Sequence, residues 1–179
     1  MFSLMETDAT LVGRVLGGDA GAYGTLVDRH APACLRFATC MLESRDEAEA
    51  ATRAALLAAY RALRSYDPHV PFRGWLFAIL IDGCRDALLA RCRRARVVTH
   101  DGERSWAPVA DRADVARAVS SLEPAYREAF LLKHVEELSY GEMATATRLT
   151  VPALKSRVRD ACDRLQSLLA TGAGADARP

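Results

Sequence analysis

Apolar residues recur at every third or fourth position along most of this chain, and no sustained run alternates β-branched with polar residues. This spacing places apolar side chains on one face of a helix, whereas a half-exposed strand needs a period of two. Half of the residues are hydrophobic, which is enough to fill a core. The pattern therefore predicts an all-α protein. One such face is made by Ala48, Thr52, Ala55, Leu56, Ala59, Tyr60 and Leu63.

Capping residues and helix breakers divide the first half of the chain into helical segments. Ser44 with Glu47 three residues later has the form of a capping box, so we expect a helix to begin there. Pro32 is expected to kink or briefly interrupt the preceding helix. We expect loops at Gly17-Gly18 and around Pro68. The predicted helices cover residues 8–16, 19–42, 44–63 and 72–92.

Helical periodicity lapses between Arg93 and Ala110, where Pro108 also occurs. This lapse predicts two small helical modules joined by a flexible linker, with modest contact between them and free relative motion. The last residues are rich in glycine and alanine, so we expect a frayed end. We assign residues 5–94 to the first module, 95–111 to the linker, 112–170 to the second module and 171–179 to a disordered tail.

Basic residues gather in two places, although the formal net charge is only +1. Two basic clusters in a nearly neutral protein favour two contacts with a polyanion, although solvated helix faces would give the same pattern. The first cluster is Arg85, Arg91, Arg93, Arg94 and Arg96, and the second is Arg148, Lys155, Arg157, Arg159 and Arg164.

The second module has the pattern of a helix-turn-helix. Ser139 can cap one short helix, and Thr150 can cap a longer one in which Pro152 lies in the first turn, where its missing N–H costs little. In this motif the second helix enters the major groove and presents its N-terminal residues to the bases. Here the residues expected to contact DNA are Lys155, Ser156, Arg157 and Arg159.

Longer stretches of both modules resemble the extracytoplasmic-function (ECF) sigma factors of bacterial RNA polymerase. Residues 122–130, 138–144 and 151–157 resemble sigma region 4. The first module is similar to sigma region 2, and the two modules occur in the family's order over about residues 8–168. The motifs that carry the region 2 resemblance are Asp8-x-x-Leu11-Val12-x-Arg14, Gly18-Asp19-x-x-Ala22-Tyr23-x-x-Leu26, Tyr60-Arg61-Ala62-Leu63 and Phe72-Arg73-x-Trp75-Leu76-x-x-Ile79.

The resemblance implies an alternative sigma factor that binds core RNA polymerase and directs it to promoters. Region 4 would read the −35 element as duplex, and region 2 would capture the −10 element as a single strand. It also implies an external anti-sigma factor as a partner. No small-molecule substrate, cofactor or metal is expected, and the protein would act in the cytoplasm.

The resemblance also places the −10 contacts in this sequence. Tyr66 and His69 lie in the loop that holds base specificity in the family, and their rings could stack on an unstacked base. Asp82 stands where relatives often have a pocket asparagine, and the arginines can neutralise phosphate. Phe72, Trp75 and Phe77 are expected in the core instead. The implied −10 contacts are Tyr66, Asp67, His69, Asp82, Arg85, Arg91, Arg93 and Arg94.

The sequence departs from the family's pattern in three parts of the chain. The helix that faces the polymerase clamp has Ala50, Arg53 and Ala54 in place of its usual acidic and amide residues, with Glu47 nearby, so polymerase binding at these four positions would be altered. Arg148 stands where the turn usually has glycine, which would cost about 1–2 kcal/mol if φ is positive. Asp160 replaces a basic DNA-facing residue.

Other classes of protein fit less well. The four histidines form no H-E-x-x-H motif, and no G-x-S-x-G or Walker loop occurs, so we expect no enzyme. At His30 and Cys34 we expect a buried thiol beside a surface imidazole and no zinc site. Five cysteines without a C-x-x-C pair are typical of free thiols. The apolar runs are too short to span a bilayer, and the N-terminus lacks a signal-peptide layout. The alternative function is a sigma-like decoy or adaptor that binds a regulator without initiating transcription.

Overall fold

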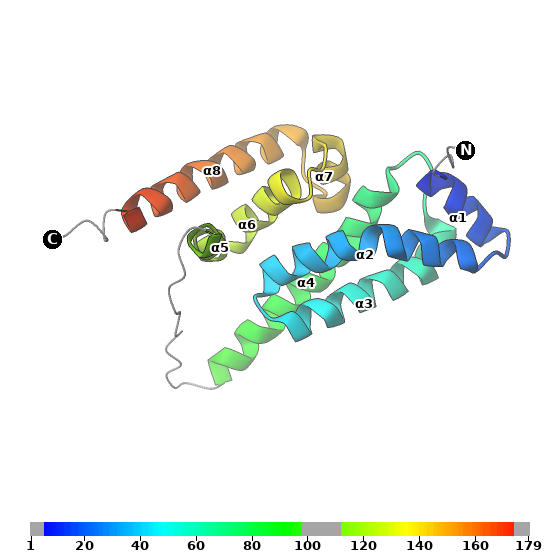
Figure 1. Cartoon of the computed structure of the whole chain (residues 1–179), viewed down its shortest axis with the longest axis horizontal. Coiled ribbons are helices and arrows are strands. Elements are labelled where there is room, and N and C mark those ends of the chain that lie inside the picture. The colour runs from blue at the N-terminus through cyan, green and yellow to red at the C-terminus, as the bar shows by residue number, and fades with distance from the viewer. Residues whose placement is uncertain (1–5, 98–111, 174–179) are drawn as a thin grey trace.

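The computed structural model describes residues 6–97 and 112–173, and every regular element within these ranges is a helix (Figure 1). The all-α prediction is confirmed. None of the described helices is long and apolar enough to cross a membrane. The first module contains α1 (Asp8–Leu16), α2 (Gly21–Leu42), α3 (Arg45–Ala62), the 3₁₀ turn η1 (Leu63–Ser65) and α4 (Phe72–Val97), and the second contains α5 (Arg112–Ser121), α6 (Pro124–Phe130), the π-helical turn η2 (Leu131–Val135), α7 (Tyr140–Thr147) and α8 (Val151–Ala173).

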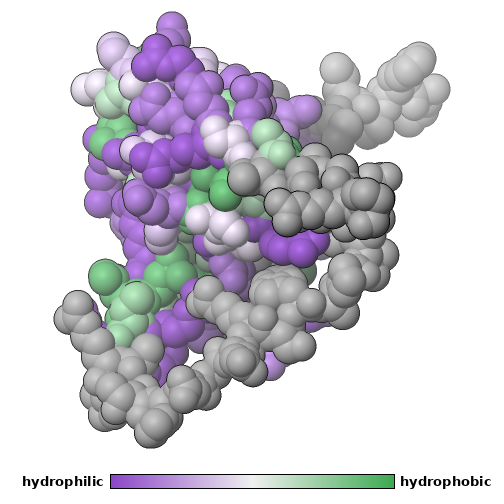
Figure 2. Space-filling view, turned by 90° about the vertical axis from the view of Figure 1, so that its left-hand side faces the viewer, coloured by the Kyte–Doolittle hydropathy of each residue, from purple (hydrophilic) through white to green (hydrophobic). Residues whose placement is uncertain are grey.

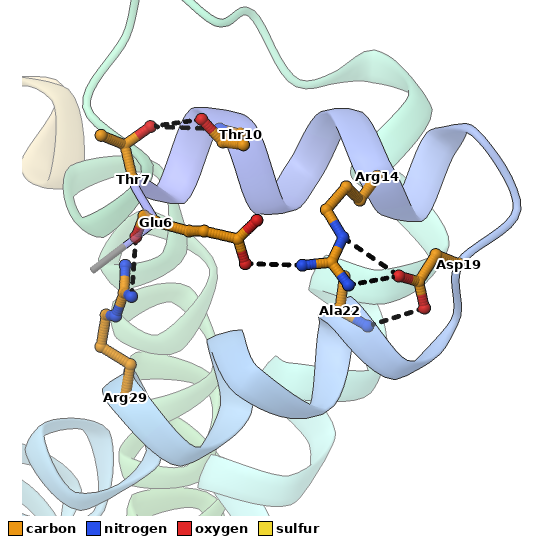
Figure 3. Close-up of polar contacts among 7 residues, drawn as sticks. All are labelled: Glu6, Thr7, Thr10, Arg14, Asp19, Ala22 and Arg29. Carbon is orange, nitrogen blue, oxygen red and sulfur yellow. Dashed lines mark hydrogen bonds and ion pairs between the residues drawn. The ribbon is translucent and has the colours of Figure 1, made fainter. Parts of the chain in front are cut away.

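Side chains at the helix ends explain the first boundaries. The Thr7 hydroxyl accepts the N–H of Thr10 at the start of α1, and the Asp19 carboxylate accepts the N–H of Ala22 at the start of α2. Figure 3 shows Arg14 lying between Glu6 and Asp19, with its guanidinium 2.6 Å from a carboxylate oxygen of each. These contacts fix the sharp turn between α1 and α2.

Two details of the predicted helices differ in the structure. α2 runs through Pro32 as a single element, so the expected break is absent. At the start of α3 the Ser44 hydroxyl accepts the N–H of Glu47, but the Glu47 carboxylate lies 3.5 Å from the Arg94 guanidinium. The cap predicted at Ser44 is therefore present, while the carboxylate that would complete the box reaches α4.

The core of the first module lies between α2, α3 and α4. Phe37 of α2 and Phe77 of α4 are fully buried, and their rings pack in a T-shaped, edge-to-face arrangement with centroids 5.5 Å apart. Phe72 is also buried and Trp75 is half-buried, so the expectation that Phe72, Trp75 and Phe77 belong to the core is confirmed. Other fully buried large side chains here are Leu11, Leu26, Met41, Leu42, Leu63, Leu76, Leu80 and Ile81.

The second module forms the predicted helix-turn-helix. Ser139 and Glu142 form a reciprocal capping box at the start of α7, and the Thr150 hydroxyl accepts the N–H of Ala153 at the start of α8. Between these helices Arg148 takes the left-handed conformation with φ +60°, as the usual glycine would. Buried Met143 and Leu154 lie on the facing sides of the two helices.

The two modules pack against each other, with the second lying along α2 and α4 (Figure 1). This is closer packing than the modest contact expected from the sequence. α4 continues to Val97 and α8 to Ala173, so helix extends into the predicted linker and the predicted tail. The rest of those two segments, residues 98–111 and 174–179, lies outside the described ranges.

The fold predicts a large stability loss for Phe37→Ala. Truncating a fully buried phenylalanine removes apolar contacts and leaves a cavity, which typically costs about 3–5 kcal/mol. We expect the free energy of unfolding, measured with urea, to fall by that amount. Leu89→Ala is the control, because Leu89 is 53% exposed and its truncation should change stability by less than about 0.5 kcal/mol. Equal losses in both variants would contradict the assignment of this core.

Candidate nucleic-acid and polymerase interfaces

The first half of α8 presents polar and basic side chains on the side away from the core. Leu154 and Val158 are buried, while Lys155 and Arg159 are exposed and Ser156 and Arg157 are partly exposed. The Lys155 ammonium lies 5.7 Å from the ring centroid of Tyr140, which steadies it over the turn. All four predicted −35 contacts are at least partly exposed, but they do not share one face, because Arg157 lies on the side of α8 toward α6, where its charge acts on Glu128. The four residues are Lys155, Ser156, Arg157 and Arg159.

Local charge pairs modify this face. The Arg159 guanidinium lies 3.6 Å from the Asp160 carboxylate and 3.4 Å from the Ser156 hydroxyl. Asp160 thus neutralises part of the charge that Arg159 offers to a phosphate. Arg164 follows Arg157 by two helical turns and packs on α6: its guanidinium lies 4.0 Å from the ring centroid of Tyr126 and 3.7 Å from the Glu123 carboxylate. Arg164 therefore packs on α6 and lies apart from the DNA-facing group.

The loop before α4 surrounds an open cavity of about 470 Å³. Asp67 accepts the N–H of His69 through its carboxylate, which holds the turn, and both side chains are exposed. Tyr66 is 7% exposed, and its hydroxyl donates to the carbonyl of Val70. Its ring lies 5.1 Å from the ring of Trp75. The prediction that Tyr66 offers a free ring face is corrected: packing against Trp75 makes it a support for the loop, and His69 is the exposed ring.

The inner wall of this cavity holds an ionic group that the sequence analysis did not assign to the site. His30 is 6% exposed, so the expectation of a surface imidazole is wrong. Its Nε2 lies 2.9 Å from the Asp8 carboxylate, which also accepts from Arg29. Burial would raise the pKa of Asp8, but the hydrogen bonds and charges of His30 and Arg29 outweigh burial and lower that pKa. Because α1 and α2 meet only in the folded chain, sequence spacing gave no signal for this group.

The basic stretch of α4 is divided between two environments. Arg93 and Arg94 are exposed near the end of the helix, and Arg91 donates to the carbonyl of Leu42. Asp82 and Arg85 instead face the second module. The predicted −10 contacts are therefore not one continuous surface in this structure. Figure 2, which views the side where α4 and α8 end, shows a mainly hydrophilic surface broken by small separate hydrophobic patches.

A shallow apolar groove runs between α2 and α3. It consists of two adjoining hollows of about 570 and 410 Å³, and Arg53 lines both. Ala50 and Ala54 are exposed beside it, whereas Glu47 is turned toward Arg94. Sequence reasoning found Arg53 but placed Leu56 and Tyr60 on the buried face of α3, whereas Leu56 is half-buried and Tyr60 is 45% exposed at this groove. The apolar residues that line the groove are Tyr23, Val27, Leu35, Leu56, Leu57 and Tyr60.

The thiols do not form a reactive or metal-binding centre. Cys34 and Cys84 are buried, and burial raises the pKa of each thiol to about 12. Within residues 6–97 and 112–173, no group of three His, Cys, Asp or Glu side chains is placed to hold a metal ion. Taken together, a helix-turn-helix with a basic outer face and a helical module with an apolar groove define a two-module DNA-binding protein with a protein partner.

Comparisons with known proteins identify the family. The family "Sigma-70 region 2" matches residues 26–94, and "Sigma-70, region 4" matches residues 112–165. The RNA polymerase sigma factor CnrH of Cupriavidus metallidurans is 30% identical, covering 92% of this chain and 95% of its own. The RNA polymerase sigma-H factor of Pseudomonas aeruginosa is 30% identical, with 92% and 96% covered. The chain therefore belongs to the sigma-70 family of RNA polymerase sigma factors.

Further matches agree with the ECF group predicted from the sequence. The ECF RNA polymerase sigma-E factor of Escherichia coli is 28% identical, covering 91% of this chain and 96% of its own. The structure of CnrH in complex with the cytosolic domain of CnrY has a TM-score of 0.73 at 28% identity, covering 93% of this chain and 99% of that one. The chain is thus similar to ECF sigma factors over both modules, and such proteins are DNA-binding regulators of transcription rather than enzymes in the usual sense.

The contacts of Asp8 with His30 and Arg29 predict that Asp8→Asn lowers the free energy of unfolding in a pH-dependent way. Near neutral pH the variant loses charge-assisted hydrogen bonds to His30 and Arg29, so its free energy of unfolding should be lower by about 1.5–3 kcal/mol. Because the folded pKa of Asp8 lies below its unfolded value, the wild-type advantage exists above the unfolded pKa of about 4 and is lost as pH falls through the folded pKa. Urea unfolding between pH 7 and pH 3 measures this. A difference that stays constant over the range, or one shared by the exposed Asp163→Asn, would contradict the prediction.

Proposed function

We propose that this sigma factor binds core RNA polymerase and directs initiation at promoters in which α8 reads the −35 element and the first module captures the −10 strand. The main observation in support is that exposed basic side chains begin α8, the second helix of the helix-turn-helix. Its location is then the cytoplasm, where polymerase and promoter are present. Family membership supplies the general activity, and the residues below are our assignments for this chain.

The −35 assignment rests on geometry and charge. The first two turns of α8 carry side chains that reach outward without contributing to the core. An arginine can bind the O6 and N7 atoms of guanine with two hydrogen bonds, while lysine and the remaining arginine neutralise phosphate. Arg157 and Lys155 lie nearest the N-terminal end of α8, which is the part that enters the major groove in this motif.

The −10 assignment rests on the loop before α4 and on the end of that helix. Asp67 and His69 are exposed beside the open cavity, and the aromatic support of Tyr66 keeps the loop in place. A single-stranded base could enter this cavity, where His69 offers a ring face and Asp67 a hydrogen-bond acceptor. Arg93 and Arg94 would contact phosphates, as would Arg85 and Arg91 where DNA can reach α4, while Asp82 would accept a hydrogen bond from a base.

The polymerase assignment rests on the groove between α2 and α3. Leu57 and Tyr60 are 53% and 45% exposed, which leaves apolar surface open for a protein partner. Arg53 adds a charge at the centre, and exposed Ala50 and Ala54 allow a partner helix to approach closely. Glu47 lies at the edge of this surface. An apolar groove of this kind offsets the missing acidic residues of the usual clamp-facing pattern.

We also propose an anti-sigma factor as a partner. One similar structure is CnrH bound to the cytosolic domain of CnrY. Another is the sigma factor RpoE of Bartonella quintana in complex with the anti-sigma factor NepR, with a TM-score of 0.70 at 25% identity, covering 83% of this chain and 96% of that one. The exposed groove and the basic faces are the surfaces that such an inhibitor would cover.

Run-off transcription tests the proposed function. Purified core polymerase is supplied with this protein and with the promoter of its own operon. A start site that depends on this protein is the expected result. Tight binding to core polymerase without initiation would contradict the proposal and would favour the decoy or adaptor.

Arg157→Ala tests the −35 assignment. The variant should fold and bind polymerase as the wild type does, yet use the promoter less well. If Arg157 reads a base, binding should weaken by about 1–3 kcal/mol with relaxed preference at one upstream position. If it contacts phosphate, binding should weaken for all sequences and the salt slope should fall by about one. Arg164→Ala is the matched control, since that arginine points toward α6. Equal binding by both variants would show that this face does not meet DNA.

A further inference from the structure

Helix α1 lies across the open cavity from the loop before α4, and an ionic group fixes it to α2. The Asp8 carboxylate, in the first turn of α1, lies 2.9 Å from Nε2 of His30 and also accepts from Arg29. The same guanidinium donates to the carbonyl of Glu6 at 2.8 Å (Figure 3). The start of α1 is therefore held to α2 by two groups of one arginine and by an imidazole.

Asp8 sets the orientation of the His30 ring. Burial raises the pKa of Asp8, but the hydrogen bonds and charges of His30 and Arg29 outweigh burial and lower it, so the carboxylate is ionised at neutral pH. An ionised carboxylate can only accept hydrogen bonds, so Nε2 of His30 must be the donor. Because the ring is buried, this directional bond leaves it little freedom to turn.

The His30 ring begins a series of aromatic contacts that ends in the loop before α4. Its centroid lies 5.4 Å from that of Phe72, the first residue of α4, and the Phe72 ring lies 5.6 Å from that of Tyr66 in an edge-to-face arrangement. The Tyr66 hydroxyl then donates to the carbonyl of Val70, at the other side of the loop. We call this series the loop support; its members are Asp8, His30, Phe72 and Tyr66.

The loop support determines where the base-capturing residues lie. Asp67 accepts the N–H of His69 through its carboxylate and the N–H of Val70 through its carbonyl, so the exposed side chains move with the loop backbone. A binding site must be held to within about 0.5 Å of its productive geometry by the residues behind it. Asp8 and His30 can therefore change the fit of a base in the cavity without contacting the base.

We propose that Asp8 and His30 are positioning residues for base preference at the −10 element: through Phe72 and Tyr66 they hold the loop in the shape that captures a base. This role rests on the proposed function, whereas the effect of the two residues on the loop does not. Helix α1 carries none of the DNA or polymerase contacts assigned above. It contributes to promoter choice from behind the loop.

Variants of the full chain interrupt the loop support at two points. Asp8→Ala removes the acceptor that orients the imidazole, and His30→Gln removes the ring that packs on Phe72. The control is Met41→Ala, which truncates a side chain that is 1% exposed near the C-terminal end of α2 and so lowers stability away from the loop. Circular dichroism checks folding, and the milder Asp8→Asn keeps the test decisive if Asp8→Ala or His30→Gln does not fold.

Fluorescence of Trp75 measures the loop directly. The chain has two tryptophans, so Trp106→Phe in every protein leaves Trp75 as the reporter, and its ring lies 5.1 Å from that of Tyr66. We expect acrylamide to quench Trp75 more strongly in Asp8→Ala and His30→Gln than in the wild type, with a shift of the emission to longer wavelength. Met41→Ala should match the wild type. Unchanged quenching in folded variants would overturn the loop support.

Run-off transcription with core polymerase measures base preference. For each protein, the yield from the promoter of its own operon is divided by the yield from a copy with one substituted −10 base. A mismatched base typically weakens binding by a factor of roughly 5–150, and we expect Asp8→Ala and His30→Gln to reduce this −10 ratio by a factor of roughly three to ten. The same ratio for a substituted −35 base should not change. A ratio does not depend on the amount of active protein, so Met41→Ala should leave both ratios at the wild-type value.

The two substitutions should not be additive. Because Asp8 acts on the loop through His30, the double variant Asp8→Ala/His30→Gln should have the −10 ratio of the more affected single variant. Losses that multiply would overturn this shared path, and folded variants with the wild-type −10 ratio would overturn the role in promoter choice. If the wild type itself initiates at no start site, the proposed function fails, while the quenching of Trp75 still decides whether Asp8 and His30 hold the loop.

Discussion

Helix α4 has to bury two faces at once, and the arrangement of both modules depends on this constraint. On one side Phe77 meets Phe37 and completes the core of the first module. On another side Gly74 lets the backbone of α7 approach. A helix with one apolar stripe could satisfy only one of these contacts, since the second would leave polar groups buried without partners. Ion pairs make the second contact possible. Arg85 pairs with the buried carboxylate of Glu128 at a place where an apolar side chain would otherwise be needed.

The distribution of charge follows from that solution. The formal net charge is +1, yet the basic residues are not uniformly free for a polyanion. Those on the first half of α8 remain exposed, and those in the middle of α4 are paired with acids of the second module. A protein that handles two DNA elements can thereby present one of its basic faces while it neutralises the other internally. Salt screens the exposed pair of Arg148 with Asp82 more strongly than the pair of Arg85 with buried Glu128.

The apolar groove between α2 and α3 and the cavity beside the loop before α4 show that aromatic residues on neighbouring elements can differ in burial. Tyr66 is buried against Trp75 and gives the loop its shape, whereas Tyr60 remains half-exposed at the groove between α2 and α3. Tyr60 lies in the last turn of α3, and Tyr66 follows shortly after the end of that helix. Their burial differs because α4 covers the loop but leaves the outer side of α3 open. A partner protein can therefore contact the groove without contacting the loop.

The sequence alone determined the helical class, the caps at Ser139 and Thr150 and the accessible residues of α8, because each depends on neighbours within one or two helical turns. It left the φ of Arg148 open, and the structure shows that it is positive. It did not determine that Tyr66 is covered, that His30 is buried against Asp8, or that Arg85 is paired with Glu128. Those outcomes join residues that are far apart in the chain. Local periodicity states which side of a helix is apolar, but only tertiary packing decides which second surface covers it and which charges that surface brings.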